Sequence, residues 1–268
     1  MRSNDLKKIQ KIELEMLKQF HTICIENDLE YFAVGGTLLG AVRHQGFIPW
    51  DDDIDLAMPR QDFELFVQIA KKNLPSHMEL SYSELNLNTL QLTDTRTKVI
   101  KGKKETPLYI DIFPLDGFPQ KKLEKFWHEK RILFQRMLCK LSVVNIMTDR
   151  DRGVLENIIV KFGKIIKTDR ILSTQKELEK LHSVVKRYSY ESSILCGNVL
   201  GRYREKEIVE KSIFGKPTIK QFETIEICCP SQTEAYLSAI YGDFMKLPPK
   251  EEQQPQNLTI VSLGDNSL

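Results

Sequence analysis

The sequence predicts an α/β (α+β) fold, a mixed β-sheet flanked by helices and carrying one helical insertion. Segments with the apolar period of helices alternate with short segments in which apolar and polar residues alternate. A glycine pair separates the first strand-like segment from the helix that follows it. We therefore expect one domain over 1–268, with its core at about 28–118 and 191–247 and a helical insertion at about 121–190.

Five elements alternate at the N-terminal end: helix, strand, helix, strand and helix. They span residues 5–27, 30–34, 37–44, 53–58 and 61–72. Thr37 is expected to cap the short second helix, which Gly46 ends. Pro59 is expected to close the second strand before the third helix begins.

Three further strands are predicted at 78–83, 89–100 and 108–113. The last is expected to stop at Pro114 and to lead into a turn at Asp116. Short strands follow within 194–229, and Ser231 is expected to cap a final helix. Between them, the basic helical region at 121–187 has one apolar stripe, formed by Phe126, Leu133, Met137, Leu138 and Leu141.

Charge and composition exclude some classes of protein. Lysine and arginine (39) nearly balance aspartate and glutamate (37), so the formal net charge is only +2. A dedicated nucleic-acid binder normally has a strong basic excess, and we expect no nucleic-acid partner. Acids nevertheless gather at 51–55, and bases gather at 98–104 and 161–170. This asymmetry suggests a cation site facing an anionic partner, although solvated surface charge accounts for each basic run equally well.

The five cysteines are odd in number and have no CxxC spacing, which is typical of packed thiols in a reducing compartment. The N-terminus lacks the apolar core of a signal peptide, and no run of about 18 apolar residues occurs. We therefore expect a cytoplasmic protein that is neither secreted nor membrane-spanning.

The most informative segment is 47–60, where four aspartates fall within 51–55 between apolar neighbours. Two carboxylates about 4 Å apart repel by roughly 1 kcal/mol in water and about 4 kcal/mol at an effective dielectric near 20. Alternation in a strand places Asp53 and Asp55 on one face, about 6.5 Å apart, while the apolar residues face the core. Such a pair can bind one or two hard divalent cations, which would remove the repulsion.

Asp111 has a similar setting, because it stands between Ile110 and Ile112 in another alternating segment. Beside Asp53 and Asp55 it would complete a carboxylate triad. Metal ions held by such a triad orient the attacking and leaving oxygens of a phosphoryl transfer and neutralise its developing charge.

An EF-hand loop and an acidic surface turn are weaker interpretations of the acidic cluster. Asp51, Asp53 and Asp55 match the first ligand positions of an EF-hand loop. Leu56, however, stands where that loop needs glycine, and Asp62 stands where it needs glutamate. An acidic surface turn would normally continue with polar residues, whereas this segment continues into a strand.

Gly35, Gly36 and Thr37 lie between a predicted strand and a short helix. Glycines allow close approach of the backbone, and the free N–H groups of a helix start favour a phosphate. Alone, this motif is equally typical of a plain tight turn. Followed by an acidic D-x-D strand, it describes a polymerase-β-like nucleotidyltransferase core.

The stretch GGTLLGAVRHQGFIPWDDDIDLAMPR, residues 35–60, resembles the signature of the LicD family of phosphocholine transferases, which is related to the fukutin group. The resemblance continues through YIDIFPLDG and AYLSAIYGDFMKLPP. It implies a nucleotidyltransferase fold, a CDP-choline-type donor and Mg²⁺, with Mn²⁺ as the alternative ion. By position, it assigns catalysis and metal binding to Asp53, Asp55 and Asp111. It places Gly35, Gly36 and Thr37 near the phosphates of the donor.

Five further residues of this stretch each have more than one interpretation. Arg43 and His44 could reach donor phosphates or cap the end of the short helix. Trp50 could stack on the nucleobase, offer its ring to a choline ammonium, or anchor the loop. Asp51 and Asp52 could bind a second cation, activate the acceptor hydroxyl, or hydrogen-bond the loop.

Taken with these features, the resemblance implies metal-dependent transfer of phosphocholine from CDP-choline to a hydroxyl of a cell-surface glycan precursor, of the teichoic acid or lipopolysaccharide type. The resemblance implies a lipid-linked acceptor. Two alternatives are a D-x-D sugar-nucleotide glycosyltransferase and a non-catalytic nucleotide-binding protein of the same fold.

Residues 126–141 and the basic segment 161–167 could rest on the anionic inner face of the plasma membrane. An ordinary amphipathic core helix is the favoured interpretation of this region.

Overall fold

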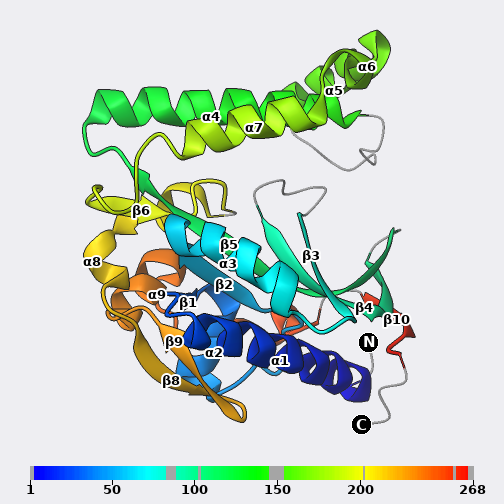
Figure 1. Ribbon diagram of the computed structural model, residues 1–268, viewed down its shortest axis with the longest axis vertical. Helices are drawn as coiled ribbons and strands as arrows, with labels where there is room; N and C mark the ends of the chain where they lie inside the picture. Colours follow the sequence, from blue (N-terminus) through cyan, green and yellow to red (C-terminus); the bar gives the residue numbers. More distant parts are fainter. Residues whose placement is uncertain are drawn as a thin grey trace.

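The computed structural model describes residues 3–82, 89–101, 104–144, 154–201, 203–255 and 258–264. A curled mixed sheet has helices on its faces, and a separate layer of helices lies above it in Figure 1. This arrangement confirms the predicted α/β architecture.

The main sheet has the strand order β1-β2-β5-β4-β10, with β3 paired to β4, and with β6 and β7 continuing from β5. In the described part of the chain, β2 and β5 pair in parallel and the other pairs are antiparallel. The strands are β1 Phe32–Ala33, β2 Asp55–Pro59, β3 Met78–Tyr82, β4 Leu90–Lys101, β5 Lys104–Phe118, β6 Leu195–Gly197, β7 Val209–Glu210 and β10 Leu258–Ser262. A separate hairpin is formed by β8 Thr218–Phe222 and β9 Ile225–Cys229.

Most helices lie where the apolar period predicts them. They are α1 Ser3–Glu26, α2 Gly35–His44, α3 Arg60–Asn73, α4 Lys122–Ser142, α5 Val154–Ile166, α6 Thr168–Ile171, α7 Thr174–Val185, α8 Lys211–Phe214 and α9 Thr233–Tyr241, with short 3₁₀ turns at Arg204–Glu207 and Lys250–Glu252. None of the helices in the described ranges combines the length and apolar content needed to cross a bilayer.

The upper layer of Figure 1 consists of α4 packed on α7, with α5 and α6 at one end. The buried side of α4 contains His128, Ile132, Gln135, Cys139 and Ser142. Gln135 Nε2 donates to Glu177 Oε2 of α7 at 2.6 Å.

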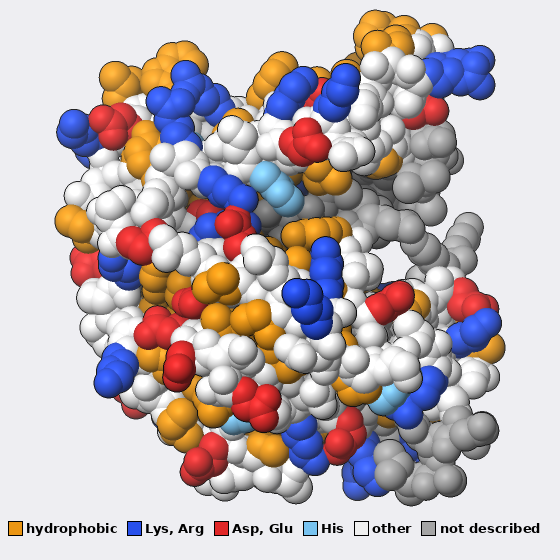
Figure 2. All heavy atoms as spheres, in the orientation of Figure 1, with side chains coloured by type: hydrophobic (Ala, Val, Ile, Leu, Met, Phe, Trp, Pro, Cys, Tyr) orange, Lys and Arg blue, Asp and Glu red, His pale blue; other side chains and the backbone are white. Residues whose placement is uncertain are grey.

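Helix α4 is an ordinary core helix on one side only, because part of its predicted apolar stripe is exposed. Phe126 and Leu133 are 47% and 49% exposed. The reason is that α7 packs on the side of α4 that carries Gln135 and Cys139, so Phe126 and Leu133 stay exposed while Met137, Leu138 and Leu141 are only partly buried. Hydrophobic side chains accordingly stand along the upper edge of the molecule in Figure 2.

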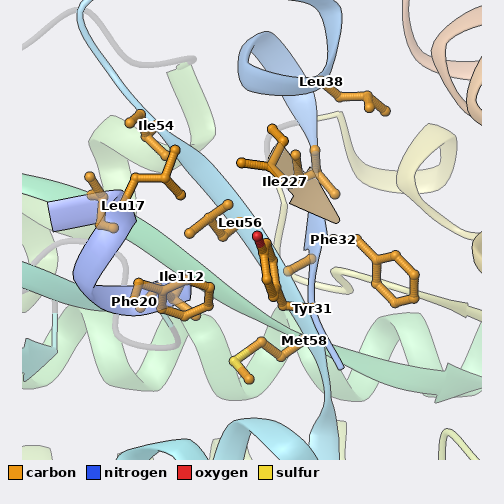
Figure 3. Close-up of a cluster of buried hydrophobic side chains, with 14 of the residues drawn as sticks. Leu17, Phe20, Tyr31, Phe32, Leu38, Ile54, Leu56, Met58, Ile112 and Ile227 are labelled. Atoms are coloured by element: carbon orange, nitrogen blue, oxygen red, sulfur yellow. The ribbon is translucent and has the colours of Figure 1, made fainter. Parts of the chain in front are cut away.

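The core of the main sheet lies between α1 and strands β2 and β5. Leu17 and Phe20 of α1 meet Leu56 and Met58 of β2 and Ile112 of β5 (Figure 3). Each of these side chains contributes roughly 1.5–3 kcal/mol on burial. Because strand side chains alternate, this packing turns the residues between them to the opposite face of the sheet.

Two predicted strand boundaries are wrong. β2 begins at Asp55, so Asp53 lies in the loop before it, and Pro59 is its last residue. β5 does not stop at Pro114 but continues to Phe118. On one side of β5, Pro114 falls between the last pair with β4, at Ile112, and the first pair with β6, at Asp116. Its missing N–H therefore leaves no ladder position empty on that side.

Asp116 belongs to strand β5, so the turn predicted at this residue is wrong. Both of its carboxylate oxygens accept hydrogen bonds from Arg60, at 2.8 Å from Nε and 2.6 Å from Nη2. Both residues are buried. This ion pair joins the start of α3 to the end of β5. Because α3 follows directly after β2, the ion pair also holds β2 and β5 together.

We expect Arg60→Ala to lower the free energy of unfolding by about 3–5 kcal/mol, because it leaves the Asp116 carboxylate buried and unpaired. Urea denaturation monitored by circular dichroism would measure the change. Glu64→Gln is the matched control, because it removes an exposed ion pair with Lys186 and should cost less than about 1 kcal/mol. Equal losses in the two variants would contradict the structural role given to Arg60.

Candidate functional site

Two carboxylates lie side by side on the polar face of the sheet. The parallel register of β2 and β5 pairs Asp55 with Asp111, and Leu56 with Ile112. Neighbouring strands are about 4.8 Å apart, so side chains at paired positions on one face are close together. The buried partners Leu56 and Ile112 point to the core, and the two aspartates therefore share the opposite face.

The loop before β2 brings two more carboxylates to this face. Asp51 and Asp53 are partly exposed, whereas Asp52 and Ile54 are buried, so the alternation of the strand extends upstream. The side chains of Asp51 and Asp53 share a hydrogen bond. Gln10 of α1 donates to the Asp51 carbonyl oxygen at 2.8 Å, which holds the loop against the helix.

The glycines of the turn allow α2 to begin in contact with these acids. A Cβ atom at Gly35 would lie 2.9 Å from Asp55 Oδ2, and one at Gly36 would lie 2.5 Å from Asp51 Oδ2. Gly35 also has a φ of 54°, which favours glycine. Any larger residue would push the start of the helix away from the carboxylates.

Thr37 does not cap α2, because the helix begins at Gly35 and Val34 occupies the cap position. Its hydroxyl instead accepts a hydrogen bond from the Asp55 N–H at 2.8 Å. The Val34 N–H donates to the Asp55 carbonyl oxygen at 3.1 Å. The glycine turn therefore holds the backbone of Asp55 on both sides.

Burial and mutual repulsion keep protons on this cluster. Burial, followed by the charge of Asp53, raises the pKa of Asp51 to about 8. The same two causes, in the same order, raise the pKa of Asp55 well above its usual range. Burial raises the pKa of Asp111 to about 6, against the opposing effects of a hydrogen bond from Gln91 and the charge of Lys101.

Sequence reasoning missed two polar residues of the site. Gln91 of β4 pairs with Asp111 and donates from Nε2 to Asp111 Oδ1 at 2.9 Å. Glu207 lies in the cleft, accepts a hydrogen bond from the Tyr203 N–H at 2.7 Å, and has a pKa raised by burial to about 6. Neither belongs to a recognisable motif, and only the register of β4 on β5 would have indicated Gln91.

A cleft with a volume of about 1240 Å³ opens over the acids. Of the residues proposed from the sequence, it is lined by Gly35, Gly36, Arg43, Trp50, Asp51, Asp53 and Asp55. Four others lie outside the lining: Thr37, His44, Asp52 and Asp111. The far wall comes from the helical layer and includes Leu133, Arg136, Met137, Lys140 and Leu141.

Arg43 is partly buried at the side of this cleft. Its Nη1 donates to the Phe244 carbonyl oxygen at 3.1 Å, and its Nε donates to His44 Nε2 at 3.0 Å. The ring of His44 lies 6.4 Å from that of Trp50, edge to face. Arg43 thus fixes the segment after α9 against the end of α2, beside the space above the acids.

The carboxylates of this cluster are the ligand type that a hard divalent cation prefers, but their side chains are not positioned to coordinate one. Within the described ranges, no group of three or more histidine, cysteine, aspartate or glutamate side chains is positioned to hold a metal ion. Carboxylate oxygens are nevertheless the ligands that Mg²⁺ and Mn²⁺ prefer. Binding by Asp53, Asp55 and Asp111 would require side-chain movement. A bound cation would offset the repulsion that, after burial, raises the pKa of Asp55.

Comparison with known proteins adds independent observations. Residues 28–144 match the model of the family described as LicD/FKTN/FKRP, nucleotidyltransferase domain. The chain is similar to the lipopolysaccharide cholinephosphotransferase LicD of Haemophilus influenzae, with 29% identity over 96% of this chain and 98% of that protein. It is also similar to an uncharacterised protein of Rickettsia prowazekii, with 33% identity over 40% of each chain.

The raised pKa values predict how stability depends on pH without divalent cations. The folded chain keeps protons on Asp111 up to a pH of about 6 and on Asp51 up to about 8, whereas the unfolded chain releases them near the ordinary value of 3.8. At these two groups the unfolded state therefore binds fewer protons in this window, so their contribution to stability falls as the pH rises from about 4 to about 8.

We expect Asp55→Asn to raise the melting temperature in EDTA at pH 8 by roughly 2–4 °C, the shift that about 1 kcal/mol gives in a chain of this size. At pH 4 the two proteins should melt together, because the carboxyl is then neutral. Differential scanning fluorimetry would measure both. Glu226→Gln, an exposed change on β9, is the control. If Asp55→Asn had no pH-dependent effect, the carboxylates would not repel one another.

Proposed function

We propose that this chain, which belongs to the LicD family, transfers phosphocholine from a CDP-choline-type donor to a hydroxyl of a cell-surface glycan precursor. The similarity to a lipopolysaccharide cholinephosphotransferase over 96% of the chain supports this activity. The placement of Asp55 beside Asp111, next to a glycine turn that starts a helix, supports the chemistry.

We also propose that the domain has the polymerase-β-like nucleotidyltransferase fold. In support, the glycines that start α2 lie beside Asp55 of β2, which is paired with Asp111 of β5. The core would comprise about 28–118 and 191–247, and 121–190 would form an insertion. The matched family domain covers residues 28–144.

The donor would bind with its phosphates at the start of α2. The N–H groups of Gly35 and Gly36 lie in the first turn of this helix, where they are free to donate to phosphate oxygens. The guanidinium of Arg43 adds positive charge at the side of the cleft. Trp50 offers an aromatic face there, suited to a nucleobase or to a choline ammonium.

Asp53, Asp55 and Asp111 would hold Mg²⁺, with Mn²⁺ as the alternative. Such an ion would supply the positive charge that offsets the donor phosphates and the transferred group. Thr37 and Gln91 would keep two of these carboxylates in place, through the Asp55 N–H and the Asp111 carboxylate.

In the reaction, the acceptor hydroxyl oxygen forms a bond to the phosphorus of phosphocholine. The bond from that phosphorus to the bridging oxygen breaks, and cytidine monophosphate leaves. A carboxylate of the cluster accepts the hydroxyl proton. Asp51 is placed for this step because it is partly exposed and lines the cleft beside Asp53 and Asp55.

The acceptor would be lipid-linked, and of the lipopolysaccharide or teichoic acid type. We place the reaction in the cytoplasm. All five cysteines are free and buried, as is usual in reducing compartments, which supports this location.

Asp53→Asn and Asp55→Asn should each lower kcat/KM by roughly 10²–10³-fold or more while leaving the circular dichroism spectrum unchanged, because the negative charge is lost but the shape is kept. The measurement is transfer of labelled phosphocholine from CDP-choline to lipopolysaccharide or teichoic acid precursors. Near-normal turnover in either variant would overturn the assignment. Sugar transfer from UDP-sugars assayed in parallel would indicate a glycosyltransferase. Nucleotide binding without product would indicate a non-catalytic protein.

Thr37→Val should lower kcat more than Thr37→Ser, because valine keeps the shape of threonine but removes the acceptor for the Asp55 N–H. We expect about a tenfold loss for valine, equivalent to about 1.4 kcal/mol of lost positioning. Steady-state kinetics of both variants would measure the difference. Equal activities would mean that the hydroxyl does not position Asp55.

A further inference from the structure

The outer side of α4 exposes four large apolar residues. Leu123, Phe126, Trp127 and Phe134 are 70%, 47%, 56% and 58% exposed. Successive members of this set are three, one and seven residues apart. With 3.6 residues per turn, this spacing places all four on one side of the helix. Ile132 and Cys139, on the opposite side, belong to the cluster buried against α7. Single exposed apolar residues are ordinary, but four large ones on the same side of one helix indicate an interaction surface.

Helix α5 continues this pattern. Ile158, Phe162 and Ile165 are 58%, 60% and 76% exposed, and they repeat at helical spacing. The Thr168 hydroxyl, just after α5, donates to the Leu141 carbonyl oxygen at 2.7 Å and so joins this region to the end of α4. We call these residues of α4 and α5 the outer apolar face.

Basic residues accompany the outer apolar face. Lys130 lies within the row on α4, with its Nζ 5.3 Å from the centre of the Phe126 ring, and exposed Arg131 is next to it. Helix α4 has six basic and two acidic residues. Lys161, Lys167 and Arg170 are exposed on or beside α5 and α6. Figure 2 shows hydrophobic and basic side chains together along the upper edge, over these helices.

We propose that the outer apolar face docks on an anionic lipid bilayer. Large apolar side chains with flanking lysine and arginine are the composition of helices that lie in the interface between headgroups and acyl chains. A second copy of the chain is the weaker occupant, because a symmetric dimer through this face would bring two basic surfaces together.

Docking would give the proposed activity access to a membrane-borne acceptor. Leu133 and Met137 lie on α4 next to the exposed row, and they line the cleft that contains Asp55. A bilayer in contact with Phe134 would therefore lie close to the mouth of that cleft. This consequence rests on the proposed function, whereas the docking itself does not.

Co-sedimentation of the full chain with vesicles tests the proposal. We expect binding to vesicles of phosphatidylcholine with phosphatidylglycerol, and much weaker binding to phosphatidylcholine alone. Phe126→Ser combined with Trp127→Ser should reduce binding by at least roughly tenfold, because two apolar contacts are lost. Lys130→Glu combined with Arg131→Glu should reduce binding to the anionic vesicles and its dependence on salt.

Ile25→Ser combined with Ile219→Ser is the matched control. These residues are 54% and 53% exposed but lie on α1 and β8, far from α4 in the sequence. Their replacement should leave vesicle binding unchanged. Melting temperatures would show that every variant is folded, since all of the changed side chains are exposed or partly exposed.

Absence of vesicle binding by the unaltered chain, or an equal loss in the control, would overturn the proposal. So would a concentration-dependent dimer that Phe126→Ser with Trp127→Ser converts to a monomer, because a second copy would then cover the face. Trp127 fluorescence should shift to the blue with anionic vesicles. Loss of docking with normal transfer to a soluble acceptor analogue would separate this inference from the proposed activity.

Discussion

The parallel pairing of β2 with β5 is the constraint on which the site depends. One register buries Leu56 and Ile112 against α1 and at the same time places Asp55 beside Asp111 on the other face. A slip by one residue would put aspartates into the core and leucine and isoleucine into the cleft, at the loss of the apolar burial. The hydrophobic core therefore fixes the geometry of the acids, although it never touches a ligand.

Burial and mutual repulsion make the cluster of acids unfavourable, and neighbouring parts of the fold hold these side chains in place. Gly35 and Gly36 let a helix start approach the carboxylates, where its N–H groups favour negative charge. Gln91 binds Asp111 from the neighbouring strand, and Arg60 binds Asp116 further along β5. Burial first, and repulsion from Asp53 after it, raise the pKa values of Asp51 and Asp111 above the ordinary range of aspartate.

Local patterns in the sequence were enough to predict much of this arrangement. The alternation in DIDLAM and LYIDIF predicted that the acids and apolar residues face opposite ways, because that alternation is a property of each strand alone. The partner of Gln91 could not be predicted, since it depends on how β4 aligns with β5. The exposed side of α4 was mispredicted for the same kind of reason: α7, far along the chain, decides which face is buried. Thr37 was taken for a cap because the bond it makes to Asp55 spans two elements.

The two hydrogen bonds from the turn to Asp55 have a consequence for engineering. Val34 and Thr37 hydrogen-bond the backbone carbonyl and N–H of this aspartate, so the glycine turn and the acidic strand move as one unit. Libraries that alter donor preference by changing the bend will also displace an acid, and the effects of substitutions in the two segments will not add. Redesign of one segment is best done by varying both together.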